Sequence, residues 1–304
     1  MGFEAKGIVP AMITPLTSDE KINEKALRAL IRHLINGGVH AIFPVGTTGE
    51  FYGLSADEKQ EVFEISRDET AGRVPVYGGT GAITTRECIR LVRIAEKSGL
   101  DAVSILTPMF ISPTQKELIE HYKRIAAETS LPILLYNNAP KTGITITPAT
   151  AVELSQVENI VGIKDSSGDF TLTAEYIRLT RGTGFSVLAG RDTLIHACLA
   201  YGGSGAIAAC ANVAPRLVAD IYDRYVAGDV AGSLEAQFTL APLRLAFTLG
   251  SFPTVIKESL ELQGIEAGPC MGPVSPMSTE ERTQLRTILT EMGVLEKNGQ
   301  GNSV

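Results

Sequence analysis

The sequence predicts an α/β protein, a (β/α)₈ barrel followed by a C-terminal helical extension. Eight short apolar runs alternate with amphipathic segments at about 30 residues per unit, which is the repeat of such a barrel. None of these runs alternates strictly between apolar and polar residues, and this favours parallel strands buried on both faces. After residue 228 the apolar runs stop and only helical patterns continue.

Each apolar run is interpreted as one strand of the barrel. A doubly wound open sheet is the alternative, but that fold carries a glycine-rich turn after its first strand. This chain has Thr14, Pro15 and Leu16 at that place, so the barrel is preferred. The expected strands are residues 7–16, 41–45, 75–79, 102–106, 132–136, 160–163, 185–188 and 206–209.

The segments between the strands have helical periodicity, and many begin at Ser or Thr, which cap free backbone N–H groups. Ser55 and Glu58 form a predicted capping box, and Gly37 and Gly99 are helix stop signals. The expected barrel helices are residues 23–36, one that begins after Ser55, 84–98, 114–129, 147–154, 171–180, 193–200 and 215–227.

The C-terminal part is predicted to be a helical extension packed on the barrel. Residues 231–249, 253–262 and 279–292 have helical patterns, and the polar tail 296–304 is expected to be frayed. We therefore divide the chain into a catalytic barrel, residues 1–228, and a C-terminal helical extension with a flexible tail, residues 229–304.

Composition excludes several classes of function. The chain has 304 residues and a net charge of −7, which argues against nucleic acid or an anionic membrane as its partner. Its four cysteines form no CxxC pair, and no cluster of ligand residues follows one strand, so we expect no metal site. Neither a secretory signal nor an apolar run of about 18 residues is present, so we expect a cytoplasmic protein.

The candidate site lies at the carboxyl ends of the strands, where barrel enzymes place their reacting groups. Lys164 ends the sixth expected strand, and a buried lysine can act as a neutral amine that forms a Schiff base with a ketone. The alternative is a salt bridge with Asp165 or another carboxylate. Tyr136 ends the neighbouring strand, where a phenol can move protons; a core tyrosine with a satisfied hydroxyl is the alternative.

The turn from Gly46 to Gly49 follows the second expected strand and carries two hydroxyls, those of Thr47 and Thr48. Backbone amides in such a turn can hold a carboxylate, although a simple tight turn is the alternative. The four histidines, in contrast, lie on or beside expected helices and strands, where a structural role is more common.

These motifs resemble those of the dihydrodipicolinate synthase and N-acetylneuraminate lyase family. The resemblance rests on Gly46-Thr47-Thr48-Gly49-Glu50, Tyr136-Asn137 with Thr142-Gly143, and Gly162-Ile163-Lys164-Asp165. It implies (β/α)₈ barrels with C-terminal helices that assemble as homotetramers, dimers of tight dimers. It also implies class I aldolase chemistry without a cofactor, in which pyruvate, or a 2-oxo acid that releases pyruvate, forms a Schiff base with lysine.

The resemblance assigns a role to each matching residue. Lys164 would form the Schiff base, Tyr136 would shuttle protons, and Thr47 would belong to the proton relay. Thr47 and Thr48 would hold the pyruvate carboxylate. Further expected substrate contacts come from Gly46, Gly190, Asp192 and Ile207.

Two departures from the family pattern bear on the substrate. A second tyrosine of the family synthases, which reaches the partner subunit's site, is replaced by Phe110, and the arginine that holds aspartate semialdehyde is replaced by Lys141. Lysine keeps the charge of arginine but loses its bidentate fork. Ser166 offers a hydroxyl to a hydroxylated substrate, or alternatively caps a helix. Ala209 stands where lyases often have serine, which disfavours sialic acid.

The sequence therefore predicts a lyase or aldolase that cleaves a 2-oxo-3-deoxy sugar acid, or a similar hydroxylated 2-oxo acid, to pyruvate and an aldehyde. The first alternative is a 4-hydroxy-tetrahydrodipicolinate synthase, which condenses pyruvate with aspartate semialdehyde. The second alternative, from another class, is a regulatory protein that binds a keto acid without turnover, because Phe110 interrupts the expected proton relay.

Overall fold

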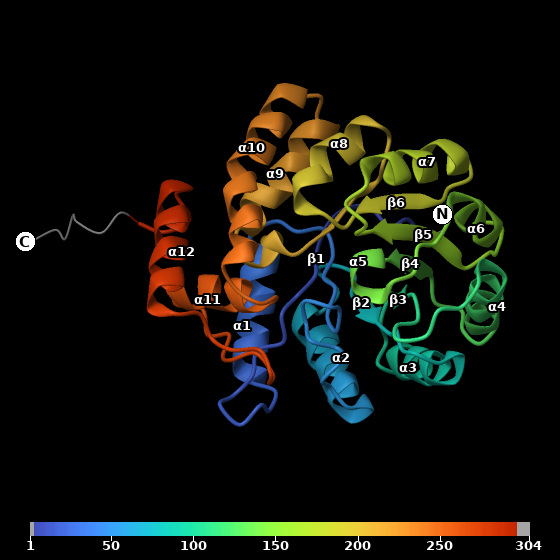
Figure 1. Cartoon of the computed structure of the whole chain (residues 1–304), viewed down its shortest axis with the longest axis horizontal. Helices are drawn as coiled ribbons and strands as arrows, with labels where there is room; N and C mark the ends of the chain where they lie inside the picture. The colour runs from blue at the N-terminus through green and yellow to red at the C-terminus, as the bar shows by residue number, and fades with distance from the viewer. Residues whose placement is uncertain (1–2, 297–304) are drawn as a thin grey trace, which may run out of the picture.

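The strands form one parallel sheet that curls into a barrel. In the computed structural model, which describes residues 3–296, the strand order is β1-β7-β6-β5-β4-β3-β2 (Figure 1). The predicted barrel architecture with a C-terminal helical extension is confirmed. The strands are β1 Gly7–Pro10, β2 Tyr77–Gly79, β3 Ala102–Leu106, β4 Ile133–Asn137, β5 Ile160–Asp165, β6 Ser186–Ala189 and β7 Gly205–Ala208.

The predicted strand 41–45 is corrected, because this segment forms only isolated bridges. Phe43 pairs with Ala11 on one side and Ile42 pairs with Val76 on the other, both in the parallel sense. The segment therefore lies between β1 and β2, where the eighth strand of the barrel is expected. Pro44 has no N–H to donate, and Val45 has a φ of 59°, so the extended conformation ends there. The predicted first strand is also shorter than expected, since β1 ends at Pro10.

The predicted barrel helices are all present, with ends that differ by a few residues. The capping box of Ser55 and Glu58 is confirmed, and Thr114 with Glu117 forms another. One short helix, α5 Ala139–Thr142, was not predicted. The others are α1 Glu24–Asn36, α2 Ala56–Thr70, α3 Thr85–Lys97, α4 Gln115–Ala126, α6 Pro148–Leu154, α7 Phe170–Thr180, α8 Ile195–Ala200 and α9 Pro215–Val226.

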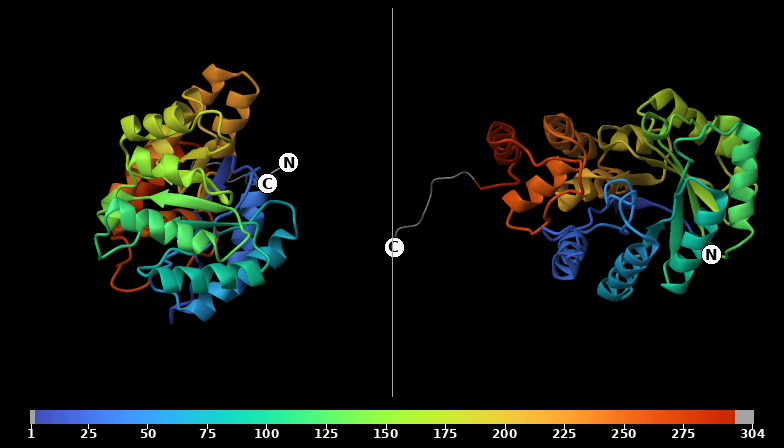
Figure 2. Two further views of the ribbon diagram at one scale, coloured as in Figure 1. Left: turned by 90° about the vertical axis from the view of Figure 1, so that its right-hand side faces the viewer. Right: turned by 60° about the horizontal axis from the view of Figure 1, so that its bottom comes forward.

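The C-terminal helices gather on one side of the barrel (Figures 1 and 2). They are α10 Val230–Ala246, α11 Thr254–Leu262 and α12 Thr279–Glu291. Helix α10 packs along α9, and α12 packs against α10 and α11. Of the predicted frayed tail, residues 297–304 lie outside the described part of the chain.

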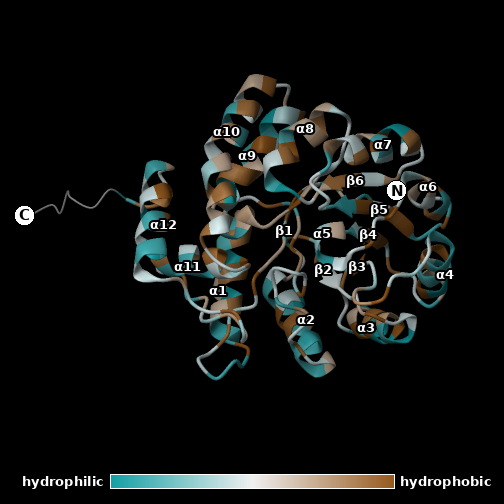
Figure 3. Ribbon diagram, in the orientation of Figure 1, coloured by the Kyte–Doolittle hydropathy of each residue, from teal (hydrophilic) through white to brown (hydrophobic). Residues whose placement is uncertain are grey.

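The barrel strands are almost fully buried, as their apolar sequences predict. Figure 3 shows hydrophobic colour on much of the sheet, with a paler β2 and a hydrophilic part of β5, and mixed faces on the surrounding helices. Within residues 3–296, no single helix is long and apolar enough to span a membrane; the sharply bent pair 230–249 and 254–262 passes by length and composition alone.

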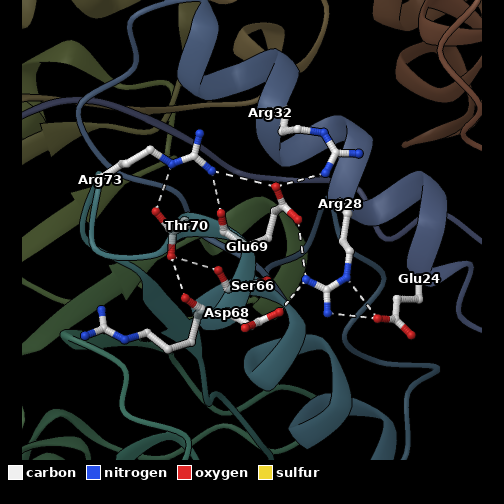
Figure 4. Close-up of polar contacts among 9 residues, drawn as sticks. Glu24, Arg28, Arg32, Ser66, Asp68, Glu69, Thr70 and Arg73 are labelled. Carbon is white, nitrogen blue, oxygen red and sulfur yellow. Dashed lines mark hydrogen bonds and ion pairs between the residues drawn. The ribbon is translucent and has the colours of Figure 1, made fainter.

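An ion-pair network joins α1 to α2 on the outside of the barrel (Figure 4). Arg28 lies 2.8 Å from Glu24, 2.6 Å from Asp68 and 3.4 Å from Glu69. Arg32 also contacts Glu69, at 3.0 Å. A single exposed ion pair stabilises the folded state by about 0–1 kcal/mol. The contribution of this network to stability therefore depends on Glu69, which both arginines share, more than on any one contact.

Candidate active site

The register of β4 and β5 brings the two central candidates together. Tyr136 is the direct partner of Lys164 in this parallel pair. The Lys164 Nζ lies 4.1 Å from the centroid of the Tyr136 ring and 5.2 Å from that of Phe43. Lys164 is only 4% exposed. Its amine is therefore held between two aromatic rings inside the barrel.

The expected alternative, a salt bridge between Lys164 and Asp165, is wrong. The Asp165 carboxylate accepts hydrogen bonds from Asn137 Nδ2 at 2.8 Å, Ser167 Oγ at 3.0 Å and Thr173 Oγ1 at 2.5 Å. Successive residues of a strand point to opposite faces, so the two side chains diverge. Within residues 3–296, Lys164 forms no ion pair, and its amine is uncommitted.

The Tyr136 hydroxyl lies in a polar network. Its oxygen is 3.4 Å from Thr47 Oγ1, and it accepts a hydrogen bond from Asn138 Nδ2 at 3.0 Å. Burial alone raises the pKa of a phenol, but the nearby positive charge of Lys164 opposes this effect. Hydrogen-bonding side chains lower the pKa further: Thr47, Ser166 and Asn138. The pKa of Tyr136 therefore falls below its usual value of 10.0, as a proton-transfer role requires.

The turn that carries Thr47 and Thr48 is held in an unusual backbone conformation. Val45 before it and Glu50 at its end have φ angles of 59° and 55°. Glycine is required at position 49, because a Cβ there would lie 2.9 Å from the Met12 carbonyl oxygen. Strained backbone of this kind persists only where the surroundings fix it, and it is common at functional sites.

Glu50 anchors this turn to the C-terminal extension. Its carboxylate accepts a hydrogen bond from the backbone N–H of Met271 at 2.7 Å and forms an ion pair with Lys257 of α11, also at 2.7 Å. Lys257 donates to the carbonyl of Pro269 as well, at 2.6 Å. Glu50 is 0% exposed and Lys257 2% exposed, so a fully buried charge pair supports the turn. The sequence analysis missed this pair.

A cavity of about 330 Å³ opens at this end of the barrel. It collects nearly all of the predicted site residues, namely Thr47, Thr48, Tyr136, Lys141, Lys164, Ser166, Gly190, Asp192 and Ile207. Gly46 is not among the lining residues. Phe110 also lies outside the cavity: it is 95% exposed, in the loop after β3, with a φ of 71°. The roles expected for all these residues stay predictions.

Asp192 and Arg244 both line the cavity and contact each other. The Asp192 carboxylate accepts from the backbone N–H of Cys210 at 2.8 Å and lies 3.5 Å from Arg244 of α10. Ser166 donates to the Gly190 carbonyl at 3.2 Å, and a Cβ at Gly190 would lie 2.0 Å from the Ser166 hydroxyl. The sequence analysis missed Arg244 because it comes from the extension, outside the barrel strands.

Among residues 3–296, no three His, Cys, Asp or Glu side chains cluster as a metal site would require. The histidines are not among the residues that line the cavity. Their polar partners lie elsewhere in the fold: Asn212 for His33, Ile8 and Asp223 for His40, Thr85 for His121 and Ser233 for His196.

Comparison with known proteins identifies the family. Residues 4–292 match the dihydrodipicolinate synthetase family. The chain belongs to this family. It is 38% identical to the 4-hydroxy-tetrahydrodipicolinate synthase of Methanopyrus kandleri over 301 residues, 98% of this chain and 100% of the relative. The synthase of Methanothrix thermoacetophila is also 38% identical, over 95% of this chain and 98% of its own.

Solved structures of family members have the same fold. YagE, a prophage protein of this family from E. coli K12 in complex with pyruvate, has a TM-score of 0.93 and 32% identity, covering 95% of this chain and 99% of its own. The dihydrodipicolinate synthase of Thermotoga maritima has a TM-score of 0.92 and 32% identity at the same coverages. The predicted membership in a family of class I Schiff-base, pyruvate-dependent enzymes is confirmed. The curated relatives are named as synthases, which favours the first alternative over sugar-acid cleavage.

Proposed function

We propose that this family member is an aldolase that forms its Schiff base between Lys164 and pyruvate, and that makes or breaks the carbon–carbon bond at pyruvate C3. One observation carries the proposal: the buried Lys164 amine has no carboxylate partner and lies against Tyr136, whose hydroxyl contacts Thr47. Pyruvate bound to YagE supports the same ligand here.

The chemistry requires only the groups already present. The deprotonated Lys164 amine attacks the C2 carbonyl of pyruvate, water leaves, and an iminium forms. Loss of a proton from C3 gives an enamine, whose C3 attacks the aldehyde carbon while the aldehyde oxygen takes up a proton. Water then hydrolyses the iminium and frees the lysine. Tyr136, with Thr47 as relay, moves these protons, and the Thr47–Thr48 turn holds the pyruvate carboxylate.

Aspartate semialdehyde is the first candidate for the second substrate, because the curated relatives are named as 4-hydroxy-tetrahydrodipicolinate synthases. Cleavage of a hydroxylated 2-oxo acid is the second candidate. It is favoured by two residues, since Lys141 lacks the fork of arginine and the exposed Phe110 offers no hydroxyl.

A pair of assays decides between these candidates. Purified enzyme is incubated with pyruvate and aspartate semialdehyde in one assay, and with 4-hydroxy-2-oxo acids in the other, where released pyruvate is followed. If condensation is the function, its kcat/KM exceeds that of every cleavage reaction by at least about tenfold, and the reverse ratio selects cleavage. Turnover of either kind excludes the non-catalytic binding protein.

Replacing Tyr136 by phenylalanine is expected to lower kcat by about 10²-fold or more, the usual contribution of a positioned acid–base group. The ring that packs on Lys164 stays, so the pyruvate adduct should still form. Rapid-quench measurement of adduct formation, beside steady-state kcat, separates the two effects. Unchanged kcat would assign proton transfer to another residue.

The assembly is a proposal from the resemblance, and the location is a proposal from the sequence. We propose a cytoplasmic homotetramer, consistent with buried free thiols at Cys88, Cys198 and Cys210 and with the exposed apolar side chains of Phe110 and Ile111. Analytical ultracentrifugation tests the tetramer.

A further inference from the structure

Arg191 has a place in the cavity that the proposed chemistry leaves unused. It follows Gly190 directly after β6, and the residue lines the cavity together with Lys164 and Ser166. Its guanidinium lies over the turn at Gly168, where a Cβ would be 3.2 Å from Nε and 3.3 Å from Nη2. Glycine at position 168, with a φ of 82°, therefore makes room for this guanidinium.

The guanidinium of Arg191 lacks a partner. Its Nε is buried without a hydrogen bond, and within residues 3–296 none of its nitrogens forms a hydrogen bond or an ion pair. The other arginine of the cavity, Arg244, contacts Asp192 at 3.5 Å. Lys141 is exposed and lies over the Phe252 ring, 5.9 Å from its centroid. Arg191 is thus a residue of the cavity lining whose cation has no counter-charge among residues 3–296.

The charge of the cavity is opposite to that of the chain. Four basic side chains line it, Lys141, Lys164, Arg191 and Arg244, against the single carboxylate of Asp192. The chain as a whole has a net charge of −7. A buried donor without an acceptor costs free energy, and a carboxylate that reaches it removes this cost. Pyruvate brings only one carboxylate, which the Thr47–Thr48 turn would hold.

We propose that Arg191 binds a second, distal carboxylate of the substrate and thereby selects dicarboxylic 2-oxo acids. The inference rests on the proposed function, because the first carboxylate and the keto group are placed at Thr47, Thr48 and Lys164. It sets the substrate class: a condensation partner that carries its own carboxylate, or a hydroxylated 2-oxo acid with a carboxylate at its far end. Sugar acids with a neutral polyol end leave Arg191 unpaired.

Calorimetric titration with two probes of equal length tests the proposal. 2-Oxoglutarate ends in a carboxylate, and 2-oxopentanoate ends in a methyl group. We expect wild-type protein to bind 2-oxoglutarate at least about tenfold more tightly. Arg191→Met should weaken 2-oxoglutarate binding by about tenfold to hundredfold, the range for a charge-assisted contact, and 2-oxopentanoate binding far less. The affinity of Arg191→Lys for 2-oxoglutarate should lie between those of wild-type protein and Arg191→Met, since lysine keeps the charge without the fork of arginine.

The control is Arg178→Met, which removes an arginine from the surface of α7, where it pairs with Glu175 and is 65% exposed. This variant should keep the wild-type ratio of the two affinities. Equal affinities of wild-type protein for the two probes would overturn the proposal, and so would equal losses for both probes in Arg191→Met. Borohydride trapping of pyruvate on wild-type protein is scored separately: its failure rejects Schiff-base chemistry, while the calorimetric ratio still decides the role of Arg191.

Discussion

Borohydride reduction in the presence of pyruvate is expected to label Lys164 and no other lysine. Reduction converts the iminium to a stable secondary amine, so the adduct survives digestion and is placed by mass spectrometry. Lys164 is the lysine that combines burial inside the cavity with a free amine. Lys257 is equally buried, but it is committed to Glu50 and to the Pro269 carbonyl.

Lys164→Ala should abolish the adduct and lower turnover by about 10⁴-fold or more, as expected when a covalent nucleophile is removed. The matched control is Lys97→Ala, which removes an exposed lysine in the last turn of α3 and should leave both readouts unchanged. An adduct on a different lysine, or one that persists in Lys164→Ala, would show that the nucleophile is misassigned.

The positions of Lys164 and Tyr136 could be predicted because the carboxyl ends of parallel strands lie at the same rim of a barrel. Lys164 and Tyr136 end adjacent strands, and the register pairs them directly. Thr47 follows a segment that makes only bridges, yet the turn still reaches the same rim because Phe43 and Ile42 fix its approach. The position of a residue at the end of an apolar run is therefore enough to predict that it lies at this rim, even where the strand is shorter than predicted.

Contacts between distant segments could not be predicted in this way. Arg244 reaches the cavity from α10 in the extension, and no local pattern marks it. Arg191 was visible at a strand end, but only the structure shows that its Nε is buried without a partner. The hydrogen-bond partners of Asp165 could not be predicted either, since Asn137 and Thr173 belong to different elements. Periodicity predicts which face a residue occupies, and the partner depends on how the elements pack.

The buried pair of Glu50 and Lys257 carries the last prediction. Lys257→Met is expected to lower the free energy of unfolding by about 3–5 kcal/mol, because it leaves the carboxylate of Glu50 without its counter-charge in the interior. Glu50 would keep only the N–H of Met271. Urea denaturation followed by circular dichroism gives the measurement, and Arg178→Met, which breaks an exposed pair, should cost about 1 kcal/mol or less.

The double variant Lys257→Met with Glu50→Gln separates charge from packing. Removing both charges should recover much of the loss, since apolar or neutral replacements of a buried pair are often close to neutral. The turn at Thr47 and Thr48 would still be less constrained, because the amide of glutamine holds Met271 less strongly than a carboxylate. We therefore expect recovered stability together with a raised half-saturating concentration of pyruvate in the trapping assay. If pyruvate saturation is unchanged while stability falls, Glu50 supports the fold without positioning the turn.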